Sequence, residues 1–164
     1  MIYINGRFLI NNPTGIENFA YGMCKAMLEK GIKFIILTPK SAIRSYDVIG
    51  FDMIKIGLFT GPLWEQIDLS FFMIGKSRDI LISFSGAGSL IIKNQIITIH
   101  DVAVFQHPEW FSKTYSILYK TITPIIARKS KAILTVSEFS KREITNLFGI
   151  NSDKVIVTYS SPKN

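Results

Sequence analysis

The chain has 164 residues, of which 48% are hydrophobic and 19% are charged, so it is long enough for one domain with a sizeable core. Nineteen lysines and arginines outnumber twelve aspartates and glutamates, and the formal charge of +7 favours an anionic partner. No apolar run is long enough to span a bilayer and no secretory signal opens the sequence, so we expect a soluble, cytoplasmic protein.

Three features narrow the classes of partner and cofactor. Cys24, the only cysteine, lies in an apolar helical pattern, which predicts a buried thiol in a reducing compartment rather than a disulfide or a metal ligand. The basic residues form neither an arginine-rich arm nor a stripe interleaved with aromatic residues, so we expect no nucleic acid. Gly86-x-Gly88 lacks the third glycine of a dinucleotide fingerprint because Ile91 takes that place, so no bound cofactor is expected.

Short apolar runs alternate with helical patterns along the whole chain. In chain order, strands are predicted at 2–4 or 2–10, then at 33–38, 53–58, 79–83, 96–99, 132–136 and 155–158. Helices are predicted at 15–30, 41–46 and 61–75, after Ser112, and from Ser137 to Gly149. This alternation predicts a three-layer α/β/α sandwich with a mostly parallel sheet, because parallel strands need helical crossovers.

The start of the first predicted helix is a candidate anion site. Thr14 and Glu17 have the spacing of a capping box, so the helix is expected to begin at Gly15. A glycine there leaves the free N–H groups of the helix start open to a phosphate. The alternative is that Gly15 only allows the helix to pack tightly, and the sequence does not decide between the two.

His100 and Asp101 follow the strand predicted at 96–99, which is apolar enough to be buried on both faces. In open α/β sheets, ligands bind at the carboxyl ends of the strands, so the pair is expected to face a crevice. The simpler interpretation makes His100 a satisfied hydrogen-bonding residue and Asp101 the cap of a turn. A metal-dependent phosphohydrolase built on this pair is disfavoured, since the chain has two histidines and no second ligand cluster.

Six short motifs resemble, together and in this order, the amino-terminal domain of family-four glycosyltransferases, which have the GT-B fold. The motifs are Gly6-Arg7, Thr14-Gly-Ile16, Leu63-Trp-Glu-Gln66, Thr98-Ile-His-Asp101, His107-Pro-Glu-Trp-Phe-Ser112 and Thr135-Val-Ser-Glu-Phe-Ser140. The resemblance implies that residues 1–164 form one Rossmann-like, acceptor-side domain, and that the nucleotide-sugar-binding domain at the carboxyl side is absent from this chain.

The resemblance also implies a reaction. Such enzymes transfer a sugar from a nucleotide-diphosphate-sugar donor to an acceptor hydroxyl, with retention of anomeric configuration and without a metal. The implied setting is the synthesis of cell-surface polysaccharide or lipid-linked oligosaccharide, at the inner face of the membrane. The acceptor is then a saccharide or a lipid-linked sugar, and this chain alone is expected to be inactive.

The resemblance assigns roles to six residues. Thr14, Gly15 and Ile16 are expected near the donor diphosphate, and His100 is expected to hydrogen-bond a donor-sugar hydroxyl and orient the reacting centre. The two other assignments are supporting roles in the cleft, for Asp101 and Ser137.

A non-enzymatic alternative is a module with this fold that binds an anionic membrane surface or a protein partner. Basic residues between Lys113 and Arg142 motivate it. A cleft face without its second domain also predicts self-association, with Trp64 or Trp110 as exposed apolar contacts.

Overall fold

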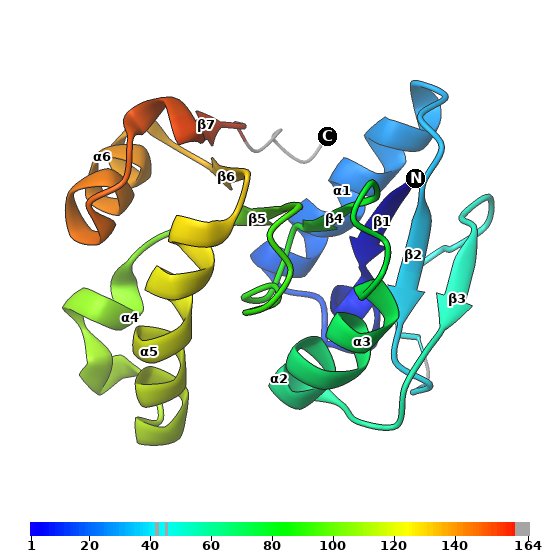
Figure 1. Ribbon diagram of the computed structural model, residues 1–164, viewed down its shortest axis with the longest axis horizontal. Helices are drawn as coiled ribbons and strands as arrows, with labels where there is room; N and C mark the ends of the chain where they lie inside the picture. Colours follow the sequence, from blue (N-terminus) through cyan, green and yellow to red (C-terminus); the bar gives the residue numbers. More distant parts are fainter. Residues whose placement is uncertain (42, 45, 160–164) are drawn as a thin grey trace.

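A computed structural model describes residues 1–41, 43–44 and 46–159. In this part of the chain, seven parallel strands form one sheet in the order β3-β2-β1-β4-β5-β6-β7 (Figure 1). The strands are β1 (Ile2–Asn5), β2 (Ile35–Thr38), β3 (Met53–Lys55), β4 (Ile80–Ser83), β5 (Gln95–Thr98), β6 (Ala132–Thr135) and β7 (Val155–Val157). The predicted Rossmann-like α/β fold is confirmed.

Helical segments connect the strands. The α-helices are α1 (Gly15–Glu29), α2 (Gly61–Trp64), α3 (Ser70–Met73), α4 (Ala103–Gln106), α5 (Lys113–Lys129) and α6 (Glu138–Phe148). Shorter segments are η1 (Gly6–Ile10), η2 (Glu65–Leu69), η3 (Pro108–Trp110) and η4 (Ser152–Lys154), of which η2 is π-helical and joins α2 to α3. No helix of the described residues is both long and apolar enough to cross a membrane.

Alternating side chains place separate cores on the two faces of β1, β2 and β4. The core under α1 contains three residues of these strands, Ile4, Ile36 and Ile82. The core under the α2–α3 segment takes Tyr3, Leu37 and Leu81. A third core packs α5 and α6 onto β5, β6 and β7. The sheet is therefore covered on both faces, as parallel sheets require (Figure 1).

The strand order reverses between β1 and β4. From β1 the chain moves outward through β2 to β3, and from β4 it moves the other way through β5 and β6 to β7. Because all strands are parallel, their carboxyl ends meet at one edge of the sheet. Such a reversal opens a crevice at that edge, which is where ligands bind in open α/β sheets.

Several predicted boundaries are wrong. Residues 6–10 form the 3-10 helix η1 and do not extend β1, because the backbone turns at Gly6 directly against β2. A Cβ at Gly6 would lie 2.5 Å from Ile36 Cγ2 and 2.6 Å from the Leu37 carbonyl oxygen. The helix expected at 41–46 is absent at residues 41, 43, 44 and 46, and its residues 42 and 45 lie outside the described part of the chain.

The first helix begins at Gly15 as predicted, but its cap differs. The Thr14 hydroxyl accepts no backbone hydrogen bond. It donates instead to the carboxylate of Glu17, which also accepts from Asn11 Nδ2 at 3.1 Å. Burial raises the pKa of Glu17, but these side chains and the backbone groups of Thr14 and Glu17 lower it below its usual value. Glu17 is therefore a carboxylate that fixes the turn into α1.

Cys24 is fully buried in the core under α1, and burial raises the pKa of its thiol to about 12. We expect this thiol to resist alkylation by iodoacetamide at pH 8 in the folded protein, because the thiolate is the reactive form. Labelling followed by mass spectrometry checks this, with the urea-unfolded chain as the positive control. Rapid labelling of the folded protein would contradict the buried placement.

Candidate functional site

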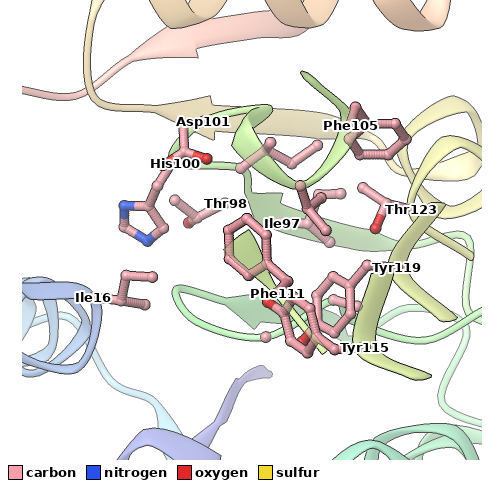
Figure 2. Close-up of a pocket in the computed structure, with 14 residues that line it drawn as sticks. Ile16, Ile97, Thr98, His100, Asp101, Phe105, Phe111, Tyr115, Tyr119 and Thr123 are labelled. Atoms are coloured by element: carbon pink, nitrogen blue, oxygen red, sulfur yellow. The ribbon is translucent and has the colours of Figure 1, made fainter. Parts of the chain in front are cut away.

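A cavity of about 180 Å³ opens at the carboxyl end of β5, at the edge where the strand order reverses (Figure 2). Strand β5 and the residues after it contribute Ile97, Thr98, Ile99, His100 and Asp101. The loop after β4 contributes Gly86 and Ala87, and the start of α1 contributes Ile16. The cavity therefore joins the two stretches that the sequence marked as candidate sites.

The imidazole of His100 lies at one end of the cavity, facing Ile16 (Figure 2). Its Nε2 atom is 3.2 Å from the carbonyl oxygen of Phe84, and its ring packs edge-on against Phe19 with centroids 5.1 Å apart. Burial lowers the pKa of His100 below its usual value, although the Phe84 carbonyl and the carboxylates of Asp101 and Glu17 act in the opposite direction.

The lowered pKa of His100 and its contact with Phe84 together indicate which ring nitrogen carries the hydrogen. The imidazole is neutral at pH 7 and carries one N–H, and a carbonyl oxygen can only accept a hydrogen bond. The N–H therefore lies on Nε2 and donates to Phe84, which leaves Nδ1 as an acceptor. Nδ1 has no hydrogen bond to any described residue, so it is available to the hydroxyl group of a ligand.

Asp101 holds the loop that follows His100. Its Oδ1 atom accepts a hydrogen bond from the N–H of Ala103 at 2.9 Å, at the start of α4. The residue is exposed and lines the cavity beside His100. This geometry agrees with the interpretation of Asp101 as the cap of a turn, and its supporting role in a cleft stays a prediction.

An aromatic wall, formed by Phe111, Tyr115 and Tyr119, closes the other side of the cavity (Figure 2). The rings stack, with centroids 5.6 Å apart for Phe111 and Tyr115 and 4.1 Å apart for Tyr115 and Tyr119. Tyr115 and Tyr119 are four residues apart on one face of α5, whereas Phe111 has an extended backbone just before the helix. Ser112 fixes the start of α5 by accepting a hydrogen bond from the N–H of Tyr115 at 3.3 Å.

A buried ion pair joins η1 to η2 and contacts Tyr119 of the aromatic wall. Arg7 Nη1 donates to Glu65 Oε2 at 2.5 Å, and Asn5 Nδ2 donates to Glu65 Oε1 at 2.7 Å. Asn5 Nδ2 also donates to the hydroxyl of Ser83 at 3.2 Å, which joins β1 to β4. Burial raises the pKa of Glu65 above its usual value, and the permanently charged guanidinium of Arg7 opposes that rise only in part.

Glu65 also shapes the loop after β4. Gly86 has φ +80°, and a Cβ there would lie 2.0 Å from Glu65 Oε1. The backbone of Ala87 hydrogen-bonds the same carboxylate and helps to lower its pKa. Since this loop carries the Phe84 carbonyl that contacts His100, Glu65 supports the histidine through the loop.

Gly15 stands in open space at the first turn of α1. A Cβ built there meets no atom of the described residues within 4 Å, and Gly15 does not have a positive φ. The tight-packing explanation for this glycine is therefore wrong. Thr14 lies at the N-cap and Ile16 lines the cavity, so the free N–H groups of this turn are next to the cavity.

We expect Gly15→Ala to leave stability unchanged or to raise it by up to about 1 kcal/mol, because alanine favours a helix over glycine. If a diphosphate approaches this backbone, the same change should lower at least tenfold any sugar-transfer activity that the protein supports. Gly22→Ala is the matched control, since Gly22 also lies on α1 with open space around it but is about two turns away from the helix start. Equal activity of both variants would contradict the diphosphate interpretation.

Ser137 does not line the cavity, and neither do Thr14 and Gly15, which lie next to Ile16 at the start of α1. It follows β6 and caps α6, where its hydroxyl accepts from the N–H of Ser140 and donates to the Ser140 hydroxyl, both at 3.0 Å. In the described residues, histidine, cysteine, aspartate and glutamate side chains do not gather in groups of three that could hold a metal ion.

Comparison with known proteins identifies the family. The model of Glycosyltransferase Family 4 matches residues 13–160, which is most of the chain. The chain belongs to Glycosyltransferase Family 4. The match spans α1 and the cavity, so the family assignment covers the site and not only the sheet.

Two curated relatives of this Family 4 chain act on O-antigen chains by name. The O-antigen chain mannosyltransferase RfbU of Salmonella typhimurium is 30% identical over 71 residues, which is 43% of this chain and 20% of that protein. The O-antigen chain mannosyltransferase B of Escherichia coli is 31% identical over 67 residues, which is 41% of this chain and 18% of that protein. The matched stretches thus span about a fifth of each relative.

Reasoning from the sequence missed two parts of this Family 4 site. Arg7 and Glu65 were noted in motifs but received no role, since a contact between residues 58 apart leaves no periodic pattern. The aromatic wall did leave a pattern in the sequence, because Phe111, Tyr115 and Tyr119 are spaced four residues apart. Tyr115 and Tyr119 were read only as part of the apolar face of a helix, and Phe111 only as part of the motif from His107 to Ser112.

Proposed function

We propose that this chain is the amino-terminal, acceptor-side half of a retaining glycosyltransferase. The enzyme would move a sugar from a nucleotide-diphosphate-sugar to an acceptor hydroxyl, in the synthesis of cell-surface polysaccharide or lipid-linked oligosaccharide. The observation that carries the proposal is the shared cavity, in which His100 after β5 faces Ile16 of α1 (Figure 2). Membership of Family 4 and the O-antigen mannosyltransferases among its relatives support it.

The first turn of α1 would bind the donor diphosphate. The N–H groups of Gly15 and Ile16 are at a helix start, where the helix dipole favours negative charge. Negative charge grows on the diphosphate as the sugar leaves, so donors that are already in place stabilise the transition state. The open space at Gly15 lets a phosphate approach the backbone closely.

His100 would position the donor sugar. Its Nδ1 atom accepts a hydrogen bond from a sugar hydroxyl, while Nε2–H holds the ring against the Phe84 carbonyl. A fixed ring orientation keeps the reacting carbon in line with the acceptor, which is an entropic contribution to catalysis. Asp101 supports this arrangement by fixing the loop after His100.

We further propose that the enzyme has a second Rossmann-like domain. In the proposed enzyme, that domain binds the nucleotide and faces this cavity, so residues 1–164 alone do not turn over donor. The test compares this chain with the natural-length protein, using a panel of nucleotide sugars and measuring release of nucleoside diphosphate. Turnover by the longer protein alone supports the proposal, and transfer by residues 1–164 alone would overturn the division into halves.

Association with an anionic membrane surface is a second proposed property. On the exposed face of α5, Lys113 and Lys120 flank Ile117, whose side chain is 67% exposed. An apolar side chain between lysines suits the interface of a membrane that contains acidic lipid. This surface also favours the alternative in which the fold serves as a non-catalytic, membrane-binding module.

Vesicle sedimentation at low salt tests the membrane surface. Replacing Lys113 and Lys120 by glutamine should release the protein from vesicles that contain phosphatidylglycerol, since each lysine near the surface contributes about 1 kcal/mol. Replacing Lys25 on α1 and Lys30, which directly follows this helix, removes the same charge elsewhere and is the control. Equal loss of binding in both variants would mean that only net charge matters.

Self-association through an exposed cleft face stays a prediction, but one of the two tryptophans expected there is buried elsewhere. Trp64 cannot contribute, because it is fully buried and its Nε1–H donates to the Ile56 carbonyl at 3.0 Å. Trp110 is 68% exposed and stacks on His107. Sedimentation velocity at several concentrations checks the prediction, and Trp110→Ala should reduce any dimer that forms there.

A further inference from the structure

We propose that the aromatic end of the cavity binds an uncharged pyranose ring, the terminal sugar of the acceptor. This inference rests on the proposed function and names the class of acceptor that the enzyme would take. It excludes an anionic sugar, such as a uronic acid, and an isoprenoid chain as the group bound there. The argument uses the size, the walls, the charge and the free polar groups of the cavity.

The size of the cavity suits one sugar ring, so with the acceptor ring inside it the donor sugar would reach His100 from the mouth. Each water needs about 10–15 Å³ of such space, so 180 Å³ offers on the order of a dozen water-sized positions. One hexose has a comparable number of heavy atoms. A chain of several isoprene units would fill this volume before its end was reached.

The walls suit a ring that has one apolar face. Tyr115 and Tyr119 present stacked aromatic rings, and the hydrocarbon face of a pyranose packs against such a surface. Apolar walls with a few polar groups are typical of sites that orient a small ligand. Figure 2 places this aromatic wall away from His100 and Ile16, so an acceptor ring here would approach the donor site from the other side.

The charges in the cavity disfavour an anion. No described residue that lines it is lysine or arginine. Arg7 is in contact with Tyr119 of the wall, but its charge is paired with Glu65. The Asp101 carboxylate at the mouth would repel a second carboxylate, and the neutral imidazole of His100 offers no compensating charge. A buried anion without a cationic partner is costly in free energy, whereas a neutral sugar avoids this cost.

The walls also contain hydroxyl groups that lack partners. Thr98 and Thr123 both line the cavity, and their buried hydroxyl oxygens have no hydrogen bond to the described residues. Figure 2 places Thr98 near His100 and Thr123 near Tyr119, at opposite ends of the cavity. Rotation of either side chain about its Cα–Cβ bond would offer a hydroxyl to a ligand that itself carries several. A hydrocarbon chain would leave both groups unsatisfied, which costs free energy.

The test uses the natural-length protein and three probes: methyl hexopyranosides, methyl glucuronide and farnesyl phosphate. Dissociation constants come from ligand-observed NMR. We expect at least one neutral pyranoside to bind, and methyl glucuronide to bind at least tenfold more weakly than its neutral counterpart, methyl glucoside. Tighter binding of the glucuronide, or binding of farnesyl phosphate alone, would overturn the inference.

Variants of the aromatic wall locate the site. Tyr115→Ala should weaken pyranoside binding at least fivefold, whereas Tyr115→Phe keeps the stacked ring and should bind like the parent protein. Trp110→Ala removes an exposed aromatic ring that does not line the cavity and should have no effect. Unchanged binding in Tyr115→Ala would also overturn the inference.

Donor turnover, measured on the same preparation, separates this inference from the proposed function. Release of nucleoside diphosphate without pyranoside binding would contradict only the acceptor class. Pyranoside binding without turnover of any nucleotide sugar would contradict the proposed enzyme and leave a saccharide-binding cavity.

Discussion

His100→Ala should lower kcat/KM for sugar transfer by about 100-fold to 1,000-fold in the natural-length protein, the usual loss when a positioned polar group at a reacting centre is removed. In the proposed function, Nδ1 of His100 receives a hydroxyl of the donor sugar, and alanine offers no acceptor. Initial rates over a range of donor concentrations measure the change. A loss confined to KM would instead indicate a role in binding alone.

The control for this prediction is His107→Ala. His107 is exposed, stacks on Trp110 with centroids 4.2 Å apart and does not line the cavity. Its removal tests whether loss of any histidine reduces the rate. Because His100 also packs against Phe19, the thermal stability of the His100→Ala protein has to be measured before its activity is compared. Full activity in a folded His100→Ala protein would exclude His100 from the reaction.

Glu65→Ala should reduce the free energy of unfolding by about 3–5 kcal/mol, because it leaves the partly buried charge of Arg7 without a partner. This is a large part of the stability of an ordinary domain, which is about 5–15 kcal/mol. Asn5 also loses its acceptor at 2.7 Å, and the loop at Gly86 loses its contact. Urea unfolding at pH 7, followed by circular dichroism, measures the effect.

Two control variants test whether the loss of stability in Glu65→Ala comes from the broken ion pair. Glu29→Ala removes an exposed carboxylate at the end of α1 and should change stability by less than about 0.5 kcal/mol. The double variant Arg7→Met with Glu65→Leu should be more stable than Glu65→Ala, since it leaves no buried charge unpaired. If Glu65→Ala costs less than about 1 kcal/mol, the network does not hold the loop after β4.

The fold was predictable because its signals are local. The run at 96–99 has the β-branched composition of a strand buried on both faces, and Ile97 is 1% exposed in the structure. Ser137 and Gly149 mark the two ends of α6 through a hydroxyl cap and a left-handed glycine with φ +59°. Such features depend on a few neighbouring residues, so their pattern survives in a single sequence.

The site was predictable only in part, because it combines distant segments. The position of His100 at the end of a buried strand predicted that it faces a crevice, and the cavity is there. The partners of His100 come from Phe84 and Phe19, which no spacing in the sequence connects to it. The 3-10 helix η1 was missed for the same reason, since Gly6 is shaped by its contact with β2.

The strand order also affects how this chain folds as it leaves the ribosome. β1 is made first, yet it lies between β2 and β4, and Ile2 pairs with Ile80. One edge of β1 therefore has no partner until some eighty residues have been synthesised, and an unpaired strand edge can associate with other chains. Substitutions that slow the folding of the β4 segment should therefore increase aggregation of the chain during synthesis.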